Sequence, residues 1–247
     1  MFDFLGDDIM FIELESDNEF KRRYFEMLKY RLAFSSLELE EIKDNIANFH
    51  QSMQIYNQLQ AINYIFGQHH ADNMTHMEFT GLLCEIAKKV TGDEISNFRT
   101  TEAIVSGSKI ERTKPSYIRN DLWYLLDNYN YQIENCKTDE ELYEIEAMAH
   151  IKLLHIHPFD DGNGRTARIL LAYNMCKNNL APCIITKEIK RKYCDLVENS
   201  DYKGMALLIE ELEIMLSLYK ELDSLGLINN DLMTKKQEEA YKLLKKK

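Results

Sequence analysis

The chain has 247 residues, of which 45% are hydrophobic and 29% charged, so it is long enough for one large domain of ordinary globular composition. Its net charge of −11 disfavours a broad surface for nucleic acid or for an anionic membrane, because both would repel an acidic protein. It has no membrane-length apolar run, no basic stretch typical of a secretory leader and no CxxC pair among its 5 cysteines. We therefore expect a cytoplasmic protein that binds neither nucleic acid nor membrane.

The chain is poor in residues that break helices. Only 9 glycines and 3 prolines interrupt it, which favours long helices over many short strands. Two helices are expected over 17–50, because apolar residues recur at every fourth position from Phe20 to Leu32. Ser36 is a candidate N-cap for the second of them. Another amphipathic helix is expected over 52–66.

Two capping boxes mark later helix starts. Thr75 is followed three residues later by Glu78, and Thr138 is followed three residues later by Glu141. These pairs predict helices over 75–90 and 138–156. Apolar periodicity predicts further helices over 116–128, 165–177, 187–198 and 201–225.

Residues 92–115 differ from their surroundings, because they combine glycine and proline with β-branched residues. This composition predicts a short β-hairpin with strands at 102–106 and 109–113 that turns through Ser106-Gly107-Ser108. The predicted fold class is therefore all-α, with one small β-hairpin. We divide the chain into N-terminal helices at 1–50, a core domain at 51–225 and a charged C-terminal tail at 226–247.

The segment from His157 to Arg168 reads HPFDDGNGRTAR and has the features of an anion site. Gly162 and Gly164 flank Asn163 just before a predicted helix, so the backbone can curl and direct its N–H groups to one point. The start of that helix adds unpaired N–H groups and partial positive charge. Arg165 and Arg168 are three residues apart and project from one helix face. Together these features predict a site for a di- or triphosphate.

Two further residues of the segment suggest a reaction. The carboxylate of Asp161 next to phosphates is suited to hold Mg²⁺, which needs only one or two protein ligands. His157 titrates near neutral pH and can accept a proton from an attacking hydroxyl. Each residue alone has a plainer interpretation: a structural histidine, an ordinary turn or a surface ion pair. If the segment were not a functional site, all of these plainer interpretations would have to be correct at the same time.

The segment resembles the signature of the Fic (Fido) family, HxFx(D/E)GNGRxxR, at every specified position. The similarity extends more loosely from about Ala61 to about Leu216 and includes Ala149-His150, Phe98-Arg99 and Arg191-Lys192-Tyr193. The resemblance implies a helical bundle of the Fic type with a β-hairpin flap beside the active-site loop.

The resemblance also implies an activity, the transfer of AMP from ATP to a Tyr, Thr or Ser hydroxyl of a target protein. His157 would then deprotonate the hydroxyl, Asp161 would hold Mg²⁺, and Arg168 would bind the γ-phosphate. The phosphates would be cradled by Gly162, Asn163, Gly164 and Arg165. The flap, about Ala103 to Lys114, would pair with an extended target segment or would only cover the site.

An inhibitory helix is a further implication of the resemblance. Many Fic proteins carry the pattern [S/T]xxxE[G/N], whose Glu pairs with the second signature Arg. Here Ser36 and Glu40 give SxxxE ahead of the core, with Glu41 where the family has Gly or Asn. The same residues also fit a plain capped surface helix.

Other functions remain open from the sequence. The fold also supports transfer of UMP, phosphate or phosphocholine, and removal of AMP, which would reuse Glu40. A different class is a nucleotide-binding regulatory or toxin–antitoxin module that acts by binding. Self-association into a homo-oligomer occurs in the family. Tyr193 is either part of an adenine pocket or a core residue.

Overall fold

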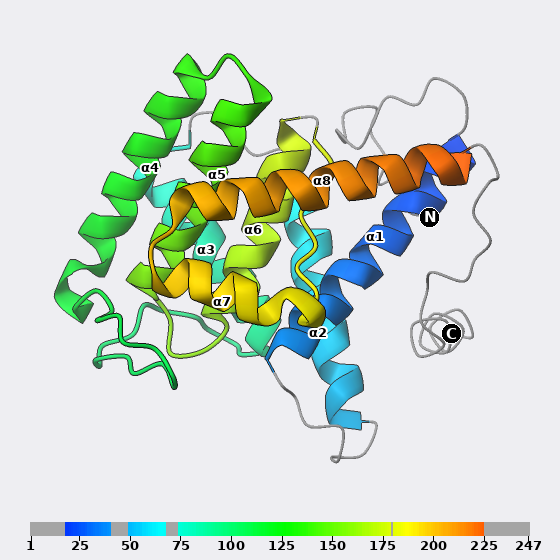
Figure 1. Ribbon diagram of the computed structural model, residues 1–247. Coiled ribbons are helices and arrows are strands. Elements are labelled where there is room, and N and C mark those ends of the chain that lie inside the picture. The colour runs from blue at the N-terminus through cyan, green and yellow to red at the C-terminus, as the bar shows by residue number, and fades with distance from the viewer. Residues whose placement is uncertain (1–17, 41–48, 68–73, 179, 225–247) are drawn as a thin grey trace.

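A computed structural model of the chain describes residues 18–40, 49–67, 74–178 and 180–224 (Figure 1). Predictions that concern other residues, including the charged tail and Glu41, lie outside this part of the chain. The described helices are α1 Asn18–Leu39, α2 Phe49–Phe66, α3 His76–Thr91, η1 Pro115–Tyr117, α4 Ile118–Asn135, α5 Asp139–Ile156, α6 Asn163–Lys177, η2 Lys187–Ile189, α7 Lys190–Glu198 and α8 Tyr202–Ser224.

The fold is all-α over the described residues, as predicted. Helix α6 lies inside the bundle and packs against α1, α2, α3 and α5, while α5 also packs against α4 and α8 (Figure 1). A helix surrounded in this way must be apolar on nearly every side. Its buried residues indeed include Ile169, Leu171 and Met175, at no more than 1% exposure. Helix α6 begins at the predicted phosphate loop, so the loop is attached to a helix that is buried on most sides by the described helices around it.

Both predicted capping boxes mark real helix starts. The Thr75 hydroxyl accepts a hydrogen bond from the Glu78 N–H, and the Glu78 carboxylate accepts one from the Thr75 N–H, at 2.8 Å. The Thr138 hydroxyl likewise accepts from the Glu141 N–H at 3.2 Å. These local contacts satisfy N–H groups that a helix start leaves without intrahelical partners.

The predicted helix break at Ser36 is wrong. Helix α1 runs without interruption to Leu39, and Ser36 lies in its last turn. Ser36 is only 2% exposed, and its hydroxyl accepts a hydrogen bond from Arg168 on α6. Its side chain therefore serves a tertiary contact and does not cap a new helix.

The strands predicted at 102–106 and 109–113 do not form; no strand occurs in the described residues, although these segments are fully described. The turn between them does form, with Gly107 at φ 79° and a hydrogen bond from Ser108 N–H to the Val105 carbonyl at 3.1 Å. The next donors bind side chains: the Lys109 N–H donates to Glu198 and the Ile110 N–H to the Ser108 hydroxyl. These two donors are therefore not available for pairing between the two segments.

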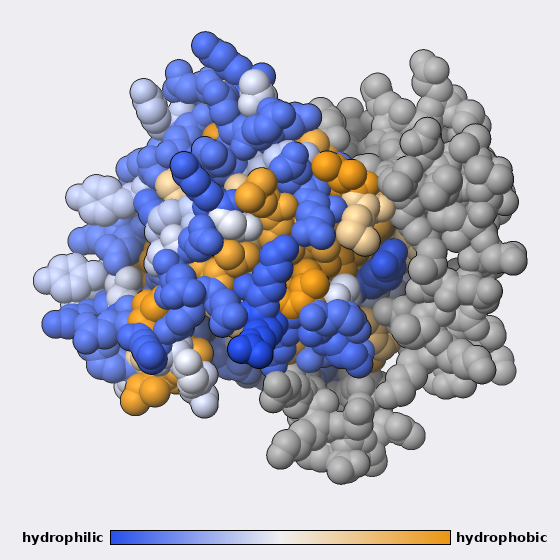
Figure 2. Space-filling view, in the orientation of Figure 1, coloured by the Kyte–Doolittle hydropathy of each residue, from blue (hydrophilic) through white to orange (hydrophobic). Residues whose placement is uncertain are grey.

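The described residues on one face of the molecule are mostly polar (Figure 2). The face seen in Figure 1 is mainly hydrophilic, and apolar groups gather near its centre (Figure 2). Among the described helices, none is long and apolar enough to span a bilayer. All five cysteines are free thiols.

Candidate active site

His157 ends helix α5 in an unusual backbone conformation. Its φ of 51° and ψ of 60° are left-handed, and its N–H still donates to the Leu153 carbonyl at 3.0 Å. The imidazole Nδ1 lies 3.3 Å from the Leu154 carbonyl, which fits an Nδ1–H donor. In that tautomer Nε2 keeps its lone pair. Burial, with the nearby Arg112 charge, lowers the pKa of His157 to about 4, so the ring is neutral at pH 7.

Arg99 holds the backbone around His157, and sequence reasoning assigned it no role. Its buried guanidinium donates to the His157 carbonyl at 2.7 Å and to the Ile156 carbonyl at 3.3 Å. The same group donates to the Thr101 carbonyl at 2.7 Å and to the Thr113 carbonyl. Arg99 thus joins both ends of the 101–113 segment to the turn that begins at His157. The only signal in the sequence was its place in the family resemblance.

The loop after His157 is closed by the Asn163 side chain. Its Oδ1 accepts from the Phe159 N–H at 2.9 Å, and its Nδ2 donates to the Phe159 carbonyl at 2.7 Å. Phe159 is 2% exposed and anchors the loop in the core. Because the amide is used within the loop, Asn163 can offer a phosphate only its backbone N–H.

Gly162 makes the turn into helix α6. Its φ of 81° is left-handed, and a Cβ there would lie 2.9 Å from a methyl group of Val90. Helix α6 begins at the next residue, so the N–H groups of Asn163, Gly164 and Arg165 lack intrahelical acceptors. The predicted curl therefore occurs at Gly162, and the N–H groups at this helix start could bind an anion.

Arg165 and Asp161 are paired at the edge of the loop. One Arg165 nitrogen donates to the Val90 carbonyl at 2.9 Å, and another donates to the Asp161 carboxylate at 2.7 Å. The Arg165 side chain is 8% exposed, whereas that of Asp161 is 75% exposed. The Asp161 carboxylate is therefore open to solvent beside the start of α6.

Arg168 is held by the end of helix α1. Its Nε donates to the Ser36 hydroxyl at 2.9 Å, and its Nη2 donates to the Ser36 carbonyl at 3.0 Å. The same Nη2 lies 2.6 Å from Glu40 Oε1. Both side chains lie against Gly164: a Cβ at that residue would be 2.9 Å from Arg168 Nη1 and 2.9 Å from Glu40 Oε1. The Glu40 carboxylate thus lies against the start of α6, where an anion is favoured.

No cluster of three potential metal ligands occurs among the residues that the structure describes. The Asp161 carboxylate is 75% exposed and lies two residues before the first residue of α6. A Mg²⁺ ion held there would take its remaining ligands from phosphate oxygens and water, as Mg²⁺ commonly does.

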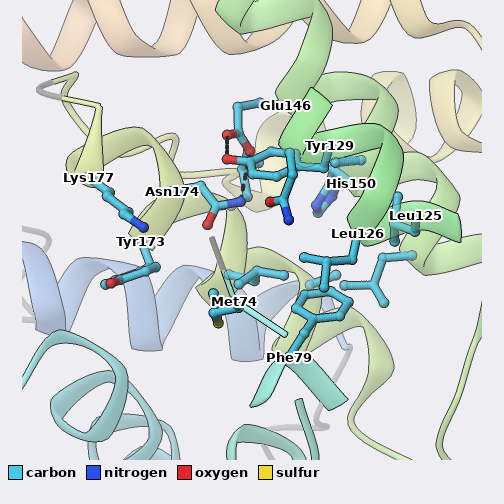
Figure 3. Close-up of a pocket in the computed structure, with 16 residues that line it drawn as sticks. Met74, Phe79, Leu125, Leu126, Tyr129, Glu146, His150, Tyr173, Asn174 and Lys177 are labelled. Atoms are coloured by element: carbon cyan, nitrogen blue, oxygen red, sulfur yellow. Dashed lines mark hydrogen bonds between the residues drawn. The ribbon is translucent and has the colours of Figure 1, made fainter. Parts of the chain in front are cut away.

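A separate cavity of about 50 Å³ lies between α4, α5 and α6 (Figure 3). Its walls include Glu146, whose carboxylate accepts from Tyr129 at 2.6 Å and from Asn174 at 3.1 Å. Burial raises the pKa of Glu146 to about 7. None of the residues 157–165 lines this cavity, so it is distinct from the loop.

The helical bundle and the loop between α5 and α6 define the fold of Fic domains. The fold is similar to that of a Fic domain-containing signaling protein from Bacteroides thetaiotaomicron, at TM-score 0.67 and 16% identity, covering 83% of this chain and 90% of that one. Fic-1 of Caenorhabditis elegans (residues 134–508) has the same TM-score at 18% identity, covering 89% of this chain and 70% of that one.

The sequence of the same region is similar to a known family. Residues 79–175 match the Fic/DOC family model. Protein adenylyltransferase Fic of Culex quinquefasciatus is 34% identical over 122 residues, which are 47% of this chain and 23% of that protein. Protein adenylyltransferase fic-1 of C. elegans is 34% identical over 115 residues, 45% and 22% respectively. The chain thus matches less than a quarter of the length of either relative.

Proposed function

We propose that this protein transfers AMP from ATP to a Tyr, Ser or Thr hydroxyl of a target protein and of itself. One observation carries the proposal: a neutral imidazole, with Nε2 able to accept a proton, begins the loop that ends at the N-terminus of a buried helix. The names of the relatives, protein adenylyltransferase, support the same reaction class. In this proposal residues 51–225 form the catalytic core.

In the proposed reaction His157 Nε2 takes the proton of the target hydroxyl. The hydroxyl oxygen forms a bond to the α-phosphorus of ATP, the bond from that phosphorus to the bridging oxygen breaks, and pyrophosphate leaves. The Arg99 contact to the His157 carbonyl supports this role, because it fixes the backbone from which the base projects. Such a transfer depends on position and charge neutralisation more than on covalent chemistry of the protein.

The start of α6 supplies the proposed phosphate site. The N–H groups of Asn163, Gly164 and Arg165, after the turn at Gly162, would bind the phosphates, and Arg168 would bind the γ-phosphate. Asp161 would hold Mg²⁺, for which its exposed carboxylate is suited. When bound, Mg²⁺ neutralises charge on the phosphates.

The test of the activity uses ATP radiolabelled at the α-phosphate. His157→Ala should lower labelling of the protein by about 10² to 10⁴, because a well-placed general base contributes that much. ATP binding measured by calorimetry should stay within a few-fold of the parent. Mass spectrometry of the modified parent identifies the transferred group. Labelling of the His157→Ala variant at the parent rate would contradict the proposal.

We further propose that the end of α1 restrains the enzyme. The Glu40 carboxylate is paired with Arg168 and lies at the helix start that a phosphate would use. It would therefore compete with the γ-phosphate for the same cation. The Ser36 contacts support this proposal, because they bind the Arg168 guanidinium to the same end of α1 that carries Glu40.

Glu40→Gly should raise self-labelling by ATP about tenfold or more, since a charge-assisted hydrogen bond contributes about 1.5–3 kcal/mol. Glu38→Gly is the matched control: Glu38 lies two residues away and makes a 3.7 Å contact with exposed Lys187. An equal rise in both variants would mean that the effect comes from loosening α1 and not from Glu40.

We propose the segment from Ala103 to Lys114 as the docking site of the target. Arg99 donates to the Thr101 carbonyl, just before this segment, and to the Thr113 carbonyl near its end, so a target bound there would be close to the proposed base. The tip donor Lys109 N–H is used by Glu198 and would have to exchange partners before a target strand could pair with it.

Removal of AMP is the second candidate, and the 2.6 Å Glu40–Arg168 contact favours it. A carboxylate at the phosphate site could orient a water molecule toward a modified hydroxyl. A target modified beforehand would be incubated with the protein with and without ATP. Loss of AMP that requires Glu40 would favour removal, and gain of AMP would favour transfer.

A further inference from the structure

The last turn of helix α5 receives hydrogen bonds from the 101–113 segment. The final carbonyls of a helix lack intrahelical donors, so they need partners from elsewhere. Arg112 Nη1 donates to the Leu154 carbonyl at 3.4 Å, and the Thr113 N–H donates to the His155 carbonyl at 3.4 Å. A cation is also favoured at this end of a helix. The segment therefore caps the helix that presents the proposed base.

The Leu154 carbonyl connects this cap to the imidazole of His157. It lies 3.3 Å from His157 Nδ1 and also accepts from Arg112. A carbonyl oxygen has two lone pairs, so it can accept from both groups at once. The contact with Nδ1 favours the tautomer in which Nε2 is free to take a proton. Arg112 thus holds the carbonyl that orients the imidazole.

The Ser108 hydroxyl connects Arg112 to the tip of the same segment. Its oxygen accepts from Arg112 Nη2 at 2.8 Å and from the Ile110 N–H at 3.2 Å. Its proton goes to the Glu198 carboxylate at 2.7 Å. A serine hydroxyl has one proton and two lone pairs, so all three are used here. Because a guanidinium and an amide only donate and a carboxylate only accepts, the direction of every hydrogen bond is fixed.

These contacts form one continuous chain of hydrogen bonds. It runs from Glu198, the last residue of α7, through Ser108 and Arg112 to the Leu154 carbonyl and His157. The end of α7 is also joined directly to α5, where a ring nitrogen of a histidine lies 2.9 Å from a carbonyl of α7. The tip of the segment and the imidazole are therefore linked through side chains held by two helices.

We propose that Ser108 is a positioning residue that holds Arg112 against the Leu154 carbonyl and so keeps the His157 imidazole in the orientation of a base. The inference rests on the proposed function, in which His157 takes the proton of the target hydroxyl. A target docked on residues 103–114 would contact the tip beside Ser108, so its binding would act on the base through the same hydrogen bonds. Neither Ser108 nor Arg112 needs to touch ATP.

The first measurement is the rate of self-labelling by ATP radiolabelled at the α-phosphate, in a Glu40→Gly parent. Ser108→Ala should lower the rate at saturating ATP about tenfold, because the lost hydroxyl accepts from a charged group. The KM for ATP should change less than about twofold, since the start of α6 is unaltered. Ser108→Thr keeps the hydroxyl and should retain most of the rate.

The second measurement does not depend on activity. Nitrogen-15 NMR shifts of an imidazole show which ring nitrogen carries the proton and at which pH the ring becomes charged, and His157→Asn identifies the signal. In the parent, His157 should carry its proton at Nδ1 and titrate well below 6.5. Ser108→Ala should raise the pKa of His157, because Arg112, whose charge lowers that pKa, is no longer held beside it.

The other groups that act on the His157 pKa are the same in all variants. Burial has the largest effect and lowers it, Arg99 also lowers it, and the Leu154 contact raises it by less than Arg112 lowers it. Glu40 would raise it, but the parent lacks this carboxylate. A change of the pKa in Ser108→Ala therefore reports the position of Arg112.

Arg112→Met tests whether Ser108 acts through Arg112. The double variant with Ser108→Ala should be no slower than Arg112→Met alone, because both changes break the same chain of contacts. Ser116→Ala removes the hydroxyl of an exposed serine in η1, outside the docking segment, and should leave the rate and the His157 pKa unchanged. Thermal unfolding of each variant confirms that it folds.

Three results would overturn the inference: an unchanged labelling rate in Ser108→Ala, an unchanged His157 pKa in that variant, or additive losses in the double variant. A parent that ATP does not label, but whose His157 pKa rises in Ser108→Ala, would refute the proposed transfer reaction and support the link from Ser108 to the imidazole. The NMR titration therefore separates failure of the proposed function from failure of the positioning role.

Discussion

The two ends of the 157–168 segment are held by different parts of the chain. At one end, His157 is fixed by contacts from Leu154 and Arg99, both within the residues 79–175 that match the Fic/DOC family model. At the other end, Arg168 forms hydrogen bonds with Ser36 and Glu40. These residues lie 132 and 128 residues earlier in the chain. The proposed base is thus held by contacts within the core, whereas the arginine of the proposed phosphate site is also bound by α1.

The largest effect is expected when the hydrogen bonds that hold the backbone at His157 are removed. Arg99→Met removes the donors that bind four backbone carbonyls, including that of His157. We expect labelling in the Glu40→Gly background to fall by about 10², because a misplacement of about 1 Å at a reacting group costs that much. Labelling rates under saturating ATP provide the measurement.

Arg99→Lys is the matched control for that change. It keeps the positive charge but loses the planar fork, so activity should recover only in part. ATP affinity should be similar in both variants, because Arg168 and the start of α6 are unchanged. A fall in ATP affinity as large as the fall in labelling would show that the two ends are not held separately.

The pH dependence of the proposed reaction tests whether the environment of His157 is independent of α1. A base whose pKa is lowered to about 4 is neutral above that pH and is lost only as the pH falls through it. The acidic limb of kcat/KM for the target should therefore lie well below 6.5, the ordinary histidine value. It should stay there in Glu40→Gly, because the low value comes mainly from burial and Arg112.

Arg112→Gln removes the charge that most lowers the His157 pKa after burial, so the acidic limb should move to higher pH. Lys114→Gln removes an exposed cation from the same segment and serves as control. A limb that shifts equally in both variants would contradict the specific role of Arg112.

The smallest effect is expected at the tip of the 103–114 segment. Glu198→Gln weakens the acceptor that occupies the Lys109 N–H and the Ser108 hydroxyl. If the target uses this backbone, its KM should fall, by no more than about fivefold for an exposed contact. Asp195→Asn on the same helix is the control, and an unchanged KM in Glu198→Gln would argue against docking at the tip.

Local signals in the sequence predicted the helices well. Thr75 and Thr138 cap their helices through residues three positions later, and such short-range contacts can be read directly from the chain. The turn at Gly162 and the anchor at Phe159 were likewise predictable, because glycine and a lone aromatic residue in a polar loop have few alternative roles.

The missed features depend on contacts between distant residues. Ser36 looks like a helix cap until Arg168 is known to bind it, 132 residues away. The β-branched residues after Gly107 favour strands, but Glu198 takes the donor that pairing would need. The Tyr193 hydroxyl was assigned to an adenine pocket or to the core, and no local pattern shows its link to His150.

The left-handed backbone at His157 has a consequence for variation at this position. For a residue other than Gly, Asn or Asp, such a φ is unfavourable by about 1–3 kcal/mol. The backbone at His157 therefore lowers the stability of the protein where the proposed chemistry occurs. Replacement by Gly or Asn would relieve that strain while removing the base. Relaxed selection on activity would therefore favour loss of this histidine in more stable descendants, and His157→Asn would make an inactive reference protein that folds at least as well as its parent.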